Sequence, residues 1–112
     1  MKPRDRYLKI VEWSKTDACY VGTCPGLMHG GIHGDDEAKV YRALCHAVDE
    51  WIEISETSGI PLPPATSGRR YSGKFMLRID ADLHKALAIQ ALKAGESLNY
   101  YCTRTLERTV KG

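Results

Sequence analysis

The last third of this 112-residue chain places one extended segment in front of two helical patterns, and this order most constrains how the chain can fold. Apolar and polar side chains alternate over residues 74–80, which predicts a short β-strand. A lone strand leaves N–H and C=O groups unpaired along both of its edges. Because the helical patterns supply no second strand, the simplest partner is the same strand from another copy of the chain. The segment therefore predicts a homodimer.

The predicted strand has two different faces, because successive side chains of an extended chain point in opposite directions. One face is apolar and consists of Phe75, Leu77 and Ile79. The other face consists of Lys74, Met76 and Arg78. A two-stranded ribbon fits the major groove of B-DNA, where arginine bonds bidentately to guanine, so the second face is a candidate for base contacts. The alternative is an ordinary edge strand with a solvated polar face.

Two short helices are expected after the strand. Asp80 is a good cap for the first helix, Gly95 ends it, and Ser97 caps the second. The free N–H groups of the second helix, beside the side chains of Ser97 and Asn99, predict DNA phosphate contacts, although Ser97 alone is also explained as a cap. The expected dimer core combines the strand with both helices and consists of Phe75, Leu77, Ile79, Leu83, Leu87, Leu98, Cys102 and Leu106.

The N-terminal half predicts a small α+β layer in which one helix packs on a sheet of three or four strands. Strands are expected at residues 7–13 and 18–23, with a shorter extended piece at residues 31–34. Asp35 is the expected cap of a long helix that ends near residues 59–61. The expected buried stripe of this helix consists of Tyr41, Leu44, Val48, Trp51 and Ile52.

Composition divides the chain into a domain at residues 1–60, a flexible linker at 61–73 and a second domain at 74–112. The linker contains three prolines, two glycines and the basic pair Arg69 and Arg70, which either contact the DNA backbone or are simply solvated. Residues 1–60 carry a net charge of −3 and residues 61–112 a net charge of +5. The acidic half suits a basic protein partner and the basic half suits DNA, unless the split is due to chance.

The sequence also indicates where in the cell the protein resides. The N-terminus is polar and no apolar run approaches the length of a membrane span, so we expect a cytoplasmic protein with no membrane partner. The four cysteines are then expected to be reduced thiols.

Two patterns could support chemistry in the N-terminal half. The series Cys19, Cys24, His29 and His33 has zinc-competent side chains, but Cys19 and Cys24 are expected on opposite faces of a strand. A two-metal nuclease would need several converging carboxylates, and the candidates are Glu12, Asp17, Asp35 and Asp36. Because only Glu12 lies inside a predicted strand, we expect no enzyme. The cysteine and histidine series is explained without a metal, so we expect no metal site and no cofactor.

Residues 73–110 resemble a ribbon-helix-helix DNA-binding domain of the Arc, MetJ and CopG type. The resemblance implies base contacts by Lys74, Met76 and Arg78 and phosphate contacts by backbone N–H groups at Ser97 and Leu98. Met76 departs from the pattern, because a polar base-reading side chain is more usual there, and this leaves the recognised base sequence open.

A wider set of strings is similar to HicB-type antitoxins. These strings include residues 10–13, 20–21, 24–27, 34–35 and 59–63 in the N-terminal half, and residues 72–79 and 97–99 in the C-terminal half. The resemblance implies a partial, inactive RNase H-like fold that binds an mRNA-cleaving HicA toxin. Cys24 and the loop at residues 29–31 depart from the family pattern, so toxin-binding residues are not transferred.

The resemblance implies an antitoxin that neutralises a HicA-like toxin and represses its own operon by binding operator DNA as a homodimer or tetramer. The alternative is a stand-alone ribbon-helix-helix transcriptional regulator with an N-terminal domain that senses a ligand or metal.

Overall fold

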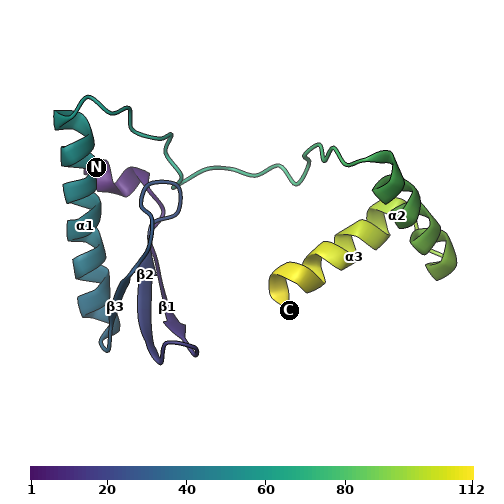
Figure 1. Ribbon diagram of the computed structural model, residues 1–112, viewed down its shortest axis with the longest axis horizontal. Helices are drawn as coiled ribbons and strands as arrows, with labels where there is room; N and C mark the ends of the chain where they lie inside the picture. Colours follow the sequence, from purple (N-terminus) through teal and green to yellow (C-terminus); the bar gives the residue numbers. More distant parts are fainter. The chain divides into compact units, whose positions relative to one another are not determined.

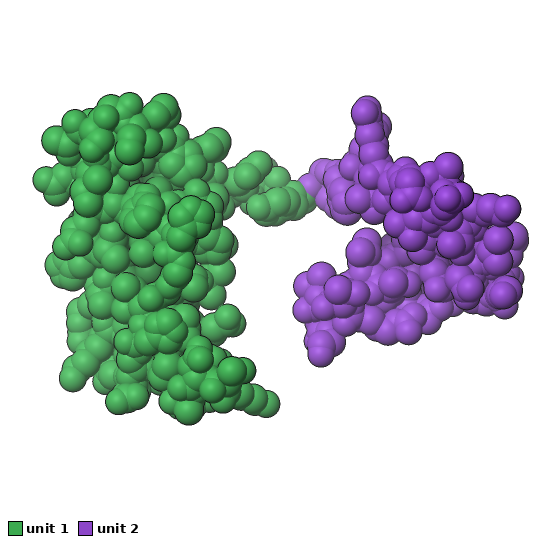
Figure 2. Space-filling model, in the orientation of Figure 1, with its two compact units in different colours: residues 1–71 green, residues 72–112 purple.

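A computed structural model describes residues 1–112, and the chain forms two compact units, residues 1–71 (unit 1) and residues 72–112 (unit 2) (Figure 2). It is an α+β protein with a three-stranded antiparallel sheet and three helices (Figure 1). None of these helices combines the length and the hydropathy needed to cross a membrane.

Unit 1 begins with a short 3-10 turn, Pro3–Arg6, and continues into the sheet. The strands are β1 (Ile10–Ser14), β2 (Cys19–Thr23) and β3 (Ile32–Gly34). They lie in the order β1-β2-β3, with Val11 opposite Gly22 and Val21 opposite His33. Both outer strands therefore have one edge without a strand neighbour.

The first strand is shorter than expected, because residues 7–9 lie outside the sheet. Tyr7 is buried in the core, and its hydroxyl donates a hydrogen bond of 2.7 Å to the carbonyl oxygen of Pro63. The N–H of Leu8 donates to Oγ1 of Thr66 at 2.8 Å. The backbone here is extended, but its partner is the segment after the long helix rather than β2.

The long helix α1 (Glu37–Thr57) packs one side against the sheet (Figure 1). Its cap is Asp36 rather than the expected Asp35, because the Asp36 carboxylate accepts a hydrogen bond of 3.0 Å from the N–H of Lys39. The expected buried stripe is wrong at two positions, since Tyr41 is 47% exposed and Trp51 39% exposed. The rest of unit 1 covers these two large aromatic side chains only in part. The buried residues of α1 are Val40, Leu44, Cys45, Val48, Ile52 and Ser55.

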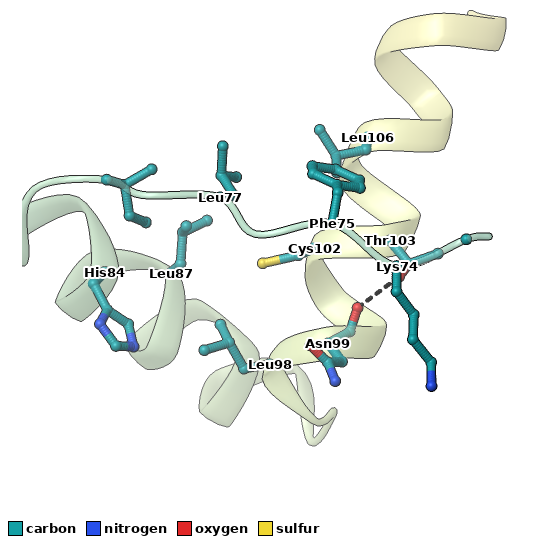
Figure 3. Close-up of a pocket in the computed structure, with 12 residues that line it drawn as sticks. Lys74, Phe75, Leu77, His84, Leu87, Leu98, Asn99, Cys102, Thr103 and Leu106 are labelled. Carbon is teal, nitrogen blue, oxygen red and sulfur yellow. Dashed lines mark hydrogen bonds between the residues drawn. The ribbon is translucent and has the colours of Figure 1, made fainter. Parts of the chain in front are cut away.

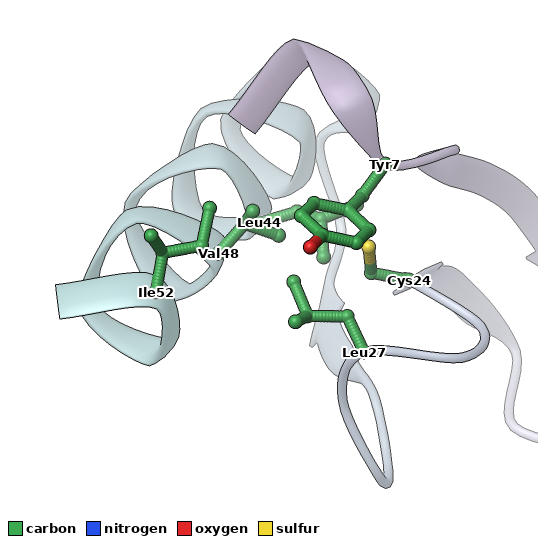
Figure 4. Close-up of a cluster of buried hydrophobic side chains, with 6 residues drawn as sticks. All are labelled: Tyr7, Cys24, Leu27, Leu44, Val48 and Ile52. Carbon is green, nitrogen blue, oxygen red and sulfur yellow. The ribbon is translucent and has the colours of Figure 1, made fainter. Parts of the chain in front are cut away.

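The core of unit 1 forms where α1 faces the start of the chain and the loop after β2. Its buried cluster consists of Tyr7, Cys24, Leu27, Leu44, Val48 and Ile52 (Figure 4). Gly22 favours this packing, because a Cβ at that position would approach Cγ1 of Val40 to 3.1 Å, a tight contact. The helix can therefore lie close against the middle strand.

The segment expected as a free linker is partly bound to unit 1. Besides the contacts of Tyr7 and Leu8, the N–H groups of Thr66 and Ser67 donate to the carbonyl oxygen of Arg6 at 2.9 and 3.0 Å. Leu62 packs against the core cluster. Residues 62–67, which we name the strap, thus complete unit 1, and the hydrogen bonds that bind the strap end at Ser67.

Unit 2 contains α2 (Ala81–Ala94) and α3 (Leu98–Lys111). The expected caps are present: Asp80 Oδ1 accepts from the N–H of Leu83 at 2.8 Å, and Ser97 Oγ accepts from the N–H of Tyr100 at 3.1 Å. Gly95 ends α2 in the left-handed conformation, with a φ angle of 68°. The sequence therefore specifies both helices and the turn between them.

Candidate functional site

The segment before α2 is extended but has no strand partner within the chain. Residues 74–80 belong to no sheet, and all of them are exposed. The Ser72 hydroxyl hydrogen-bonds to the backbone at the start of the segment. Its Oγ accepts from the N–H of Lys74 and donates to the carbonyl oxygen of Lys74, both at 3.1 Å. The expected strand is thus not paired in a single copy, because the chain offers no second strand of matching length beside it.

An apolar groove of about 580 Å³ lies between this segment and the two helices of unit 2 (Figure 3). Its lining consists of Gly73, Lys74, Phe75, Leu77, Ile79, His84, Leu87, Leu98, Asn99, Cys102, Thr103 and Leu106. All of the expected dimer-core residues except Leu83 line this groove. The structure therefore gathers on one surface side chains that are spread over more than thirty positions of the sequence.

The alternation of the segment is visible in the groove. Phe75, Leu77 and Ile79 line it, whereas Met76 and Arg78 do not. Met76 is 78% exposed. Lys74 lines the groove at its edge, so of the three expected base-contact residues only Met76 and Arg78 lie wholly outside it. Base contacts by the three residues remain a prediction.

Unit 2 does not bury its own apolar side chains. Ala91 is its only buried residue, while Phe75 is 79% and Leu77 63% exposed in a single copy. Exposed apolar surface of this kind usually marks an interaction site. The two helices of unit 2 therefore form no hydrophobic core of their own, whereas unit 1 does.

The start of α3 presents free backbone donors. Ser97 caps the N–H of Tyr100, so the N–H groups of Leu98 and Asn99 in the same first turn have no partner within the helix. Ser97 and Asn99 are exposed and Leu98 is half-buried. The positive end of the helix dipole adds to these donors, and together they form an end suited to an anion such as phosphate.

An ion pair fixes the turn that carries this helix start. Arg104 donates a hydrogen bond of 2.9 Å to the Glu96 carboxylate, which lies just before the cap of α3. This hydrogen bond raises the pKa of Arg104 above its ordinary value, so the guanidinium is charged at every accessible pH. The guanidinium also lies 5.8 Å from the centre of the Tyr101 ring.

Sequence patterns missed three groove residues, which are Gly73 and the two helical residues His84 and Thr103. Both stand at helical spacing from expected core residues: His84 is three positions before Leu87, and Thr103 is three positions before Leu106. Spacing was thus the available signal. This spacing was not recognised because histidine and threonine are polar, whereas a buried stripe is identified from apolar side chains.

The candidates for chemistry in unit 1 are dispersed. Cys24 lies in the core, and His33 lies in β3 with its Nε2 3.8 Å from Oδ2 of Asp17. Nowhere in the chain do three or more His, Cys, Asp or Glu side chains gather in a way that could hold a metal ion. Among the nuclease candidates, Glu12 lies in β1, whereas Asp35 and Asp36 precede α1. All four cysteines are free thiols.

Comparison with protein families gives a match to the HicB family over residues 64–106. No curated protein and no solved structure matches this chain. The matched range includes every residue that lines the groove, both helix caps and the N–H donors of α3. This similarity supports a HicB-type protein. The matched range covers the last residues of unit 1 and most of unit 2, the unit whose apolar side chains are exposed.

Proposed function

We propose that this protein is the antitoxin of a type II toxin-antitoxin pair, similar to HicB. In this proposal unit 1 binds and neutralises a HicA-like mRNA-cleaving toxin, and unit 2 represses the operon by binding operator DNA as a ribbon-helix-helix dimer. The protein acts by binding rather than by catalysis. The observation that carries the proposal is the apolar groove of unit 2, which lies wholly within the range similar to the HicB family.

Dimerisation follows from the chemistry of the groove. The groove is lined along one side by an extended segment with unpaired backbone groups. A second copy of residues 74–80 would pair these groups and cover Phe75 and Leu77 in the same step. An unrelated apolar ligand would cover the side chains but would leave the backbone unpaired. The second copy is therefore the occupant that fits both features.

DNA binding uses the side of the segment that the dimer leaves free. The ribbon would present Met76 and Arg78 twice, together with Lys74, at a width that the major groove accepts. The N–H groups of Leu98 and Asn99 would hold the flanking phosphates and fix the register of the ribbon. Unit 2 is also basic, with seven Lys or Arg against four Asp or Glu in residues 72–112. This charge favours association with DNA.

Toxin binding is assigned to unit 1. Residues 1–60 carry a net charge of −3, which complements a small basic protein and disfavours DNA. Unit 1 as a whole carries a net charge of −1, because Arg69 and Arg70 lie at its end, and unit 2 carries +3. The difference in charge agrees with the division of work between the units.

Co-expression is the first test of this function. The probe is the small basic protein encoded by the neighbouring reading frame, expressed alone and together with the full chain. We expect growth arrest with the neighbour alone and restored growth with both. A neighbour that is harmless, or that stays toxic in the presence of this chain, would contradict the antitoxin and favour a stand-alone regulator.

Operator binding is tested separately with DNA from upstream of the same operon. We expect the full chain to retard this DNA at salt concentrations that release unrelated DNA of equal length. Equal affinity for both DNAs would remove operon repression from the proposal and leave toxin binding intact.

A further inference from the structure

The outer side of α1 carries charges that do not stabilise the helix. Residues 43–60 contain four carboxylates and no Lys or Arg. The C-terminal end of a helix carries a partial negative charge and is stabilised by cations, yet the last turn of α1 has no basic residue. Glu50 and Glu53 also stand three positions apart, where like charges repel on a helix surface. These carboxylates therefore act against the stability of α1.

Only one of the four carboxylates has a cationic partner. Asp49 pairs with Arg4 at 3.0 Å, and this ion pair ties the N-terminal turn to the helix. Glu50, Glu53 and Glu56 take part in no ion pair within the chain. Three unpaired carboxylates thus lie in the C-terminal half of α1, on its exposed side, while the opposite side of the helix packs on the core.

Apolar side chains lie beside these carboxylates. Ile54 is 62% exposed and Trp51 is 39% exposed. Residues at positions i, i+3, i+4 and i+7 share one side of a helix, which places Ala47, Glu50, Trp51 and Ile54 together. Glu53 lies three positions after Glu50 and borders the same side. We name the resulting surface, which consists of Ala47, Glu50, Trp51, Glu53 and Ile54, the α1 patch. It combines an aromatic anchor, the residue type most enriched at the centres of protein interfaces, with an acidic border.

We propose that the α1 patch is the docking surface for a small basic protein, and this proposal rests on the proposed function, in which that partner is the toxin. The negative charge of the α1 patch indicates which kind of partner would bind it. A second copy would bring a second set of unpaired carboxylates against the first, and DNA would be repelled by them. A basic protein surface would neutralise Glu50 and Glu53 while it covers Trp51 and Ile54. The partner would also relieve the repulsion within the helix.

The test uses the full chain and the small basic protein of the neighbouring reading frame in isothermal titration calorimetry. Two variants alter the patch: Ile54→Lys, and the double variant Glu50→Lys/Glu53→Lys. We expect each to weaken binding about tenfold or more, as for an interface centre. Raised salt should weaken the wild-type complex more than the complex of the double variant.

Two matched controls lie on another element of unit 1. Trp13→Ala removes an aromatic side chain that is 53% exposed in β1, and Glu12→Lys reverses an exposed carboxylate of the same strand. We expect both variants to bind within about twofold of wild type, because rim and remote substitutions change affinity little. Loss of binding in these variants, with the α1 variants unaffected, would move the docking surface to the sheet and overturn the proposal.

Stability separates a docking role from a structural one. Lysine at position 53 would complement the negative end of the helix, so Glu53→Lys should preserve or raise the melting temperature of unit 1 while it weakens binding. A variant that lost binding only in proportion to lost helicity would show that the carboxylate supports the fold, contrary to the proposal.

The remaining outcomes distinguish this proposal from the proposed function. If the wild-type chain does not bind the neighbouring protein, the antitoxin function fails and the docking surface fails with it. If wild type binds and both α1 variants bind equally well, the antitoxin function stands and only the surface is wrong. If Ile54→Lys changes the oligomeric mass but not toxin binding, the patch is a contact between copies and the proposal is overturned.

Discussion

At the scale of single residues, Cys24 has no exposed surface and lies at the centre of the core of unit 1. Burial raises the pKa of its thiol above the ordinary value of 9.0, and nearby Lys9 opposes this shift only in part. The thiol is therefore neutral in the folded chain. The unfolded chain releases this proton at a lower pH, so its stabilising effect is complete below pH 9 and is lost as the pH rises further.

This linkage gives a prediction for alkaline pH. We compare wild type with Cys24→Ala by urea unfolding, followed by tryptophan fluorescence, since Trp13 and Trp51 both lie in unit 1. The wild-type advantage in unfolding free energy should be constant at pH 7 to 8 and should shrink above pH 9. A constant difference across that range would show that Cys24 does not ionise on unfolding. Cys19→Ala, at a less buried position, serves as the control.

Arg78 is the residue on which sequence-specific DNA binding should depend most. It stands outside the apolar groove, on the side of the segment that a dimer leaves free. We expect Arg78→Ala to cost about 1–3 kcal/mol of operator affinity, the value of a good bidentate base contact. Fluorescence anisotropy with operator and unrelated DNA measures the loss. Lys93→Ala in the last turn of α2 is the matched control, and an equal loss in both variants would indicate charge alone.

At the scale of secondary-structure elements, the extended segment 74–80 should decide the oligomeric state if the proposed dimer forms. Leu77 and Met76 are adjacent and both exposed in one copy, at 63% and 78%. Only Leu77 lines the groove. Leu77→Asp should therefore convert the dimer to a monomer, because two carboxylates would be buried in the shared core. Met76→Asp should remain dimeric and lose DNA affinity. Sedimentation equilibrium compares the two, and equal masses would contradict the ribbon.

At the scale of the whole molecule, the strap makes unit 1 longer than composition indicates. A fragment of residues 1–60 lacks the hydrogen bonds from Tyr7 to Pro63 and from Thr66 to Arg6, and it lacks the packing of Leu62. Such bonds contribute about 0.5–1.5 kcal/mol each. The bonds from Leu8 to Thr66 and from Ser67 to Arg6 are lost as well, so four bonds are missing and we expect residues 1–60 to be about 2–6 kcal/mol less stable than residues 1–71. Thermal unfolding by circular dichroism measures the difference, and equal stabilities would show that the strap contributes nothing.

Local signals in the sequence determined the two helices of unit 2 and the turn between them. Asp80, Gly95 and Ser97 act through hydrogen bonds and φ angles within a few residues of themselves, so their roles do not depend on the rest of the fold. The alternation of residues 74–80 likewise separates the groove-lining side chains from Met76 and Arg78 without knowledge of the helices. Short-range chemistry can be read from order and spacing.

Contacts between distant residues could be decided only by the tertiary structure. The hydroxyl of Tyr7 and the carbonyl of Pro63 are 56 positions apart, and no local pattern indicates that this pair exists. The exposure of Tyr41 and Trp51 depends on what the rest of unit 1 places against α1. The sequence determined the two helices of unit 2 and which side chains of each segment share a face. The tertiary structure decided which of these faces are covered, because burial depends on what the rest of the chain places against them.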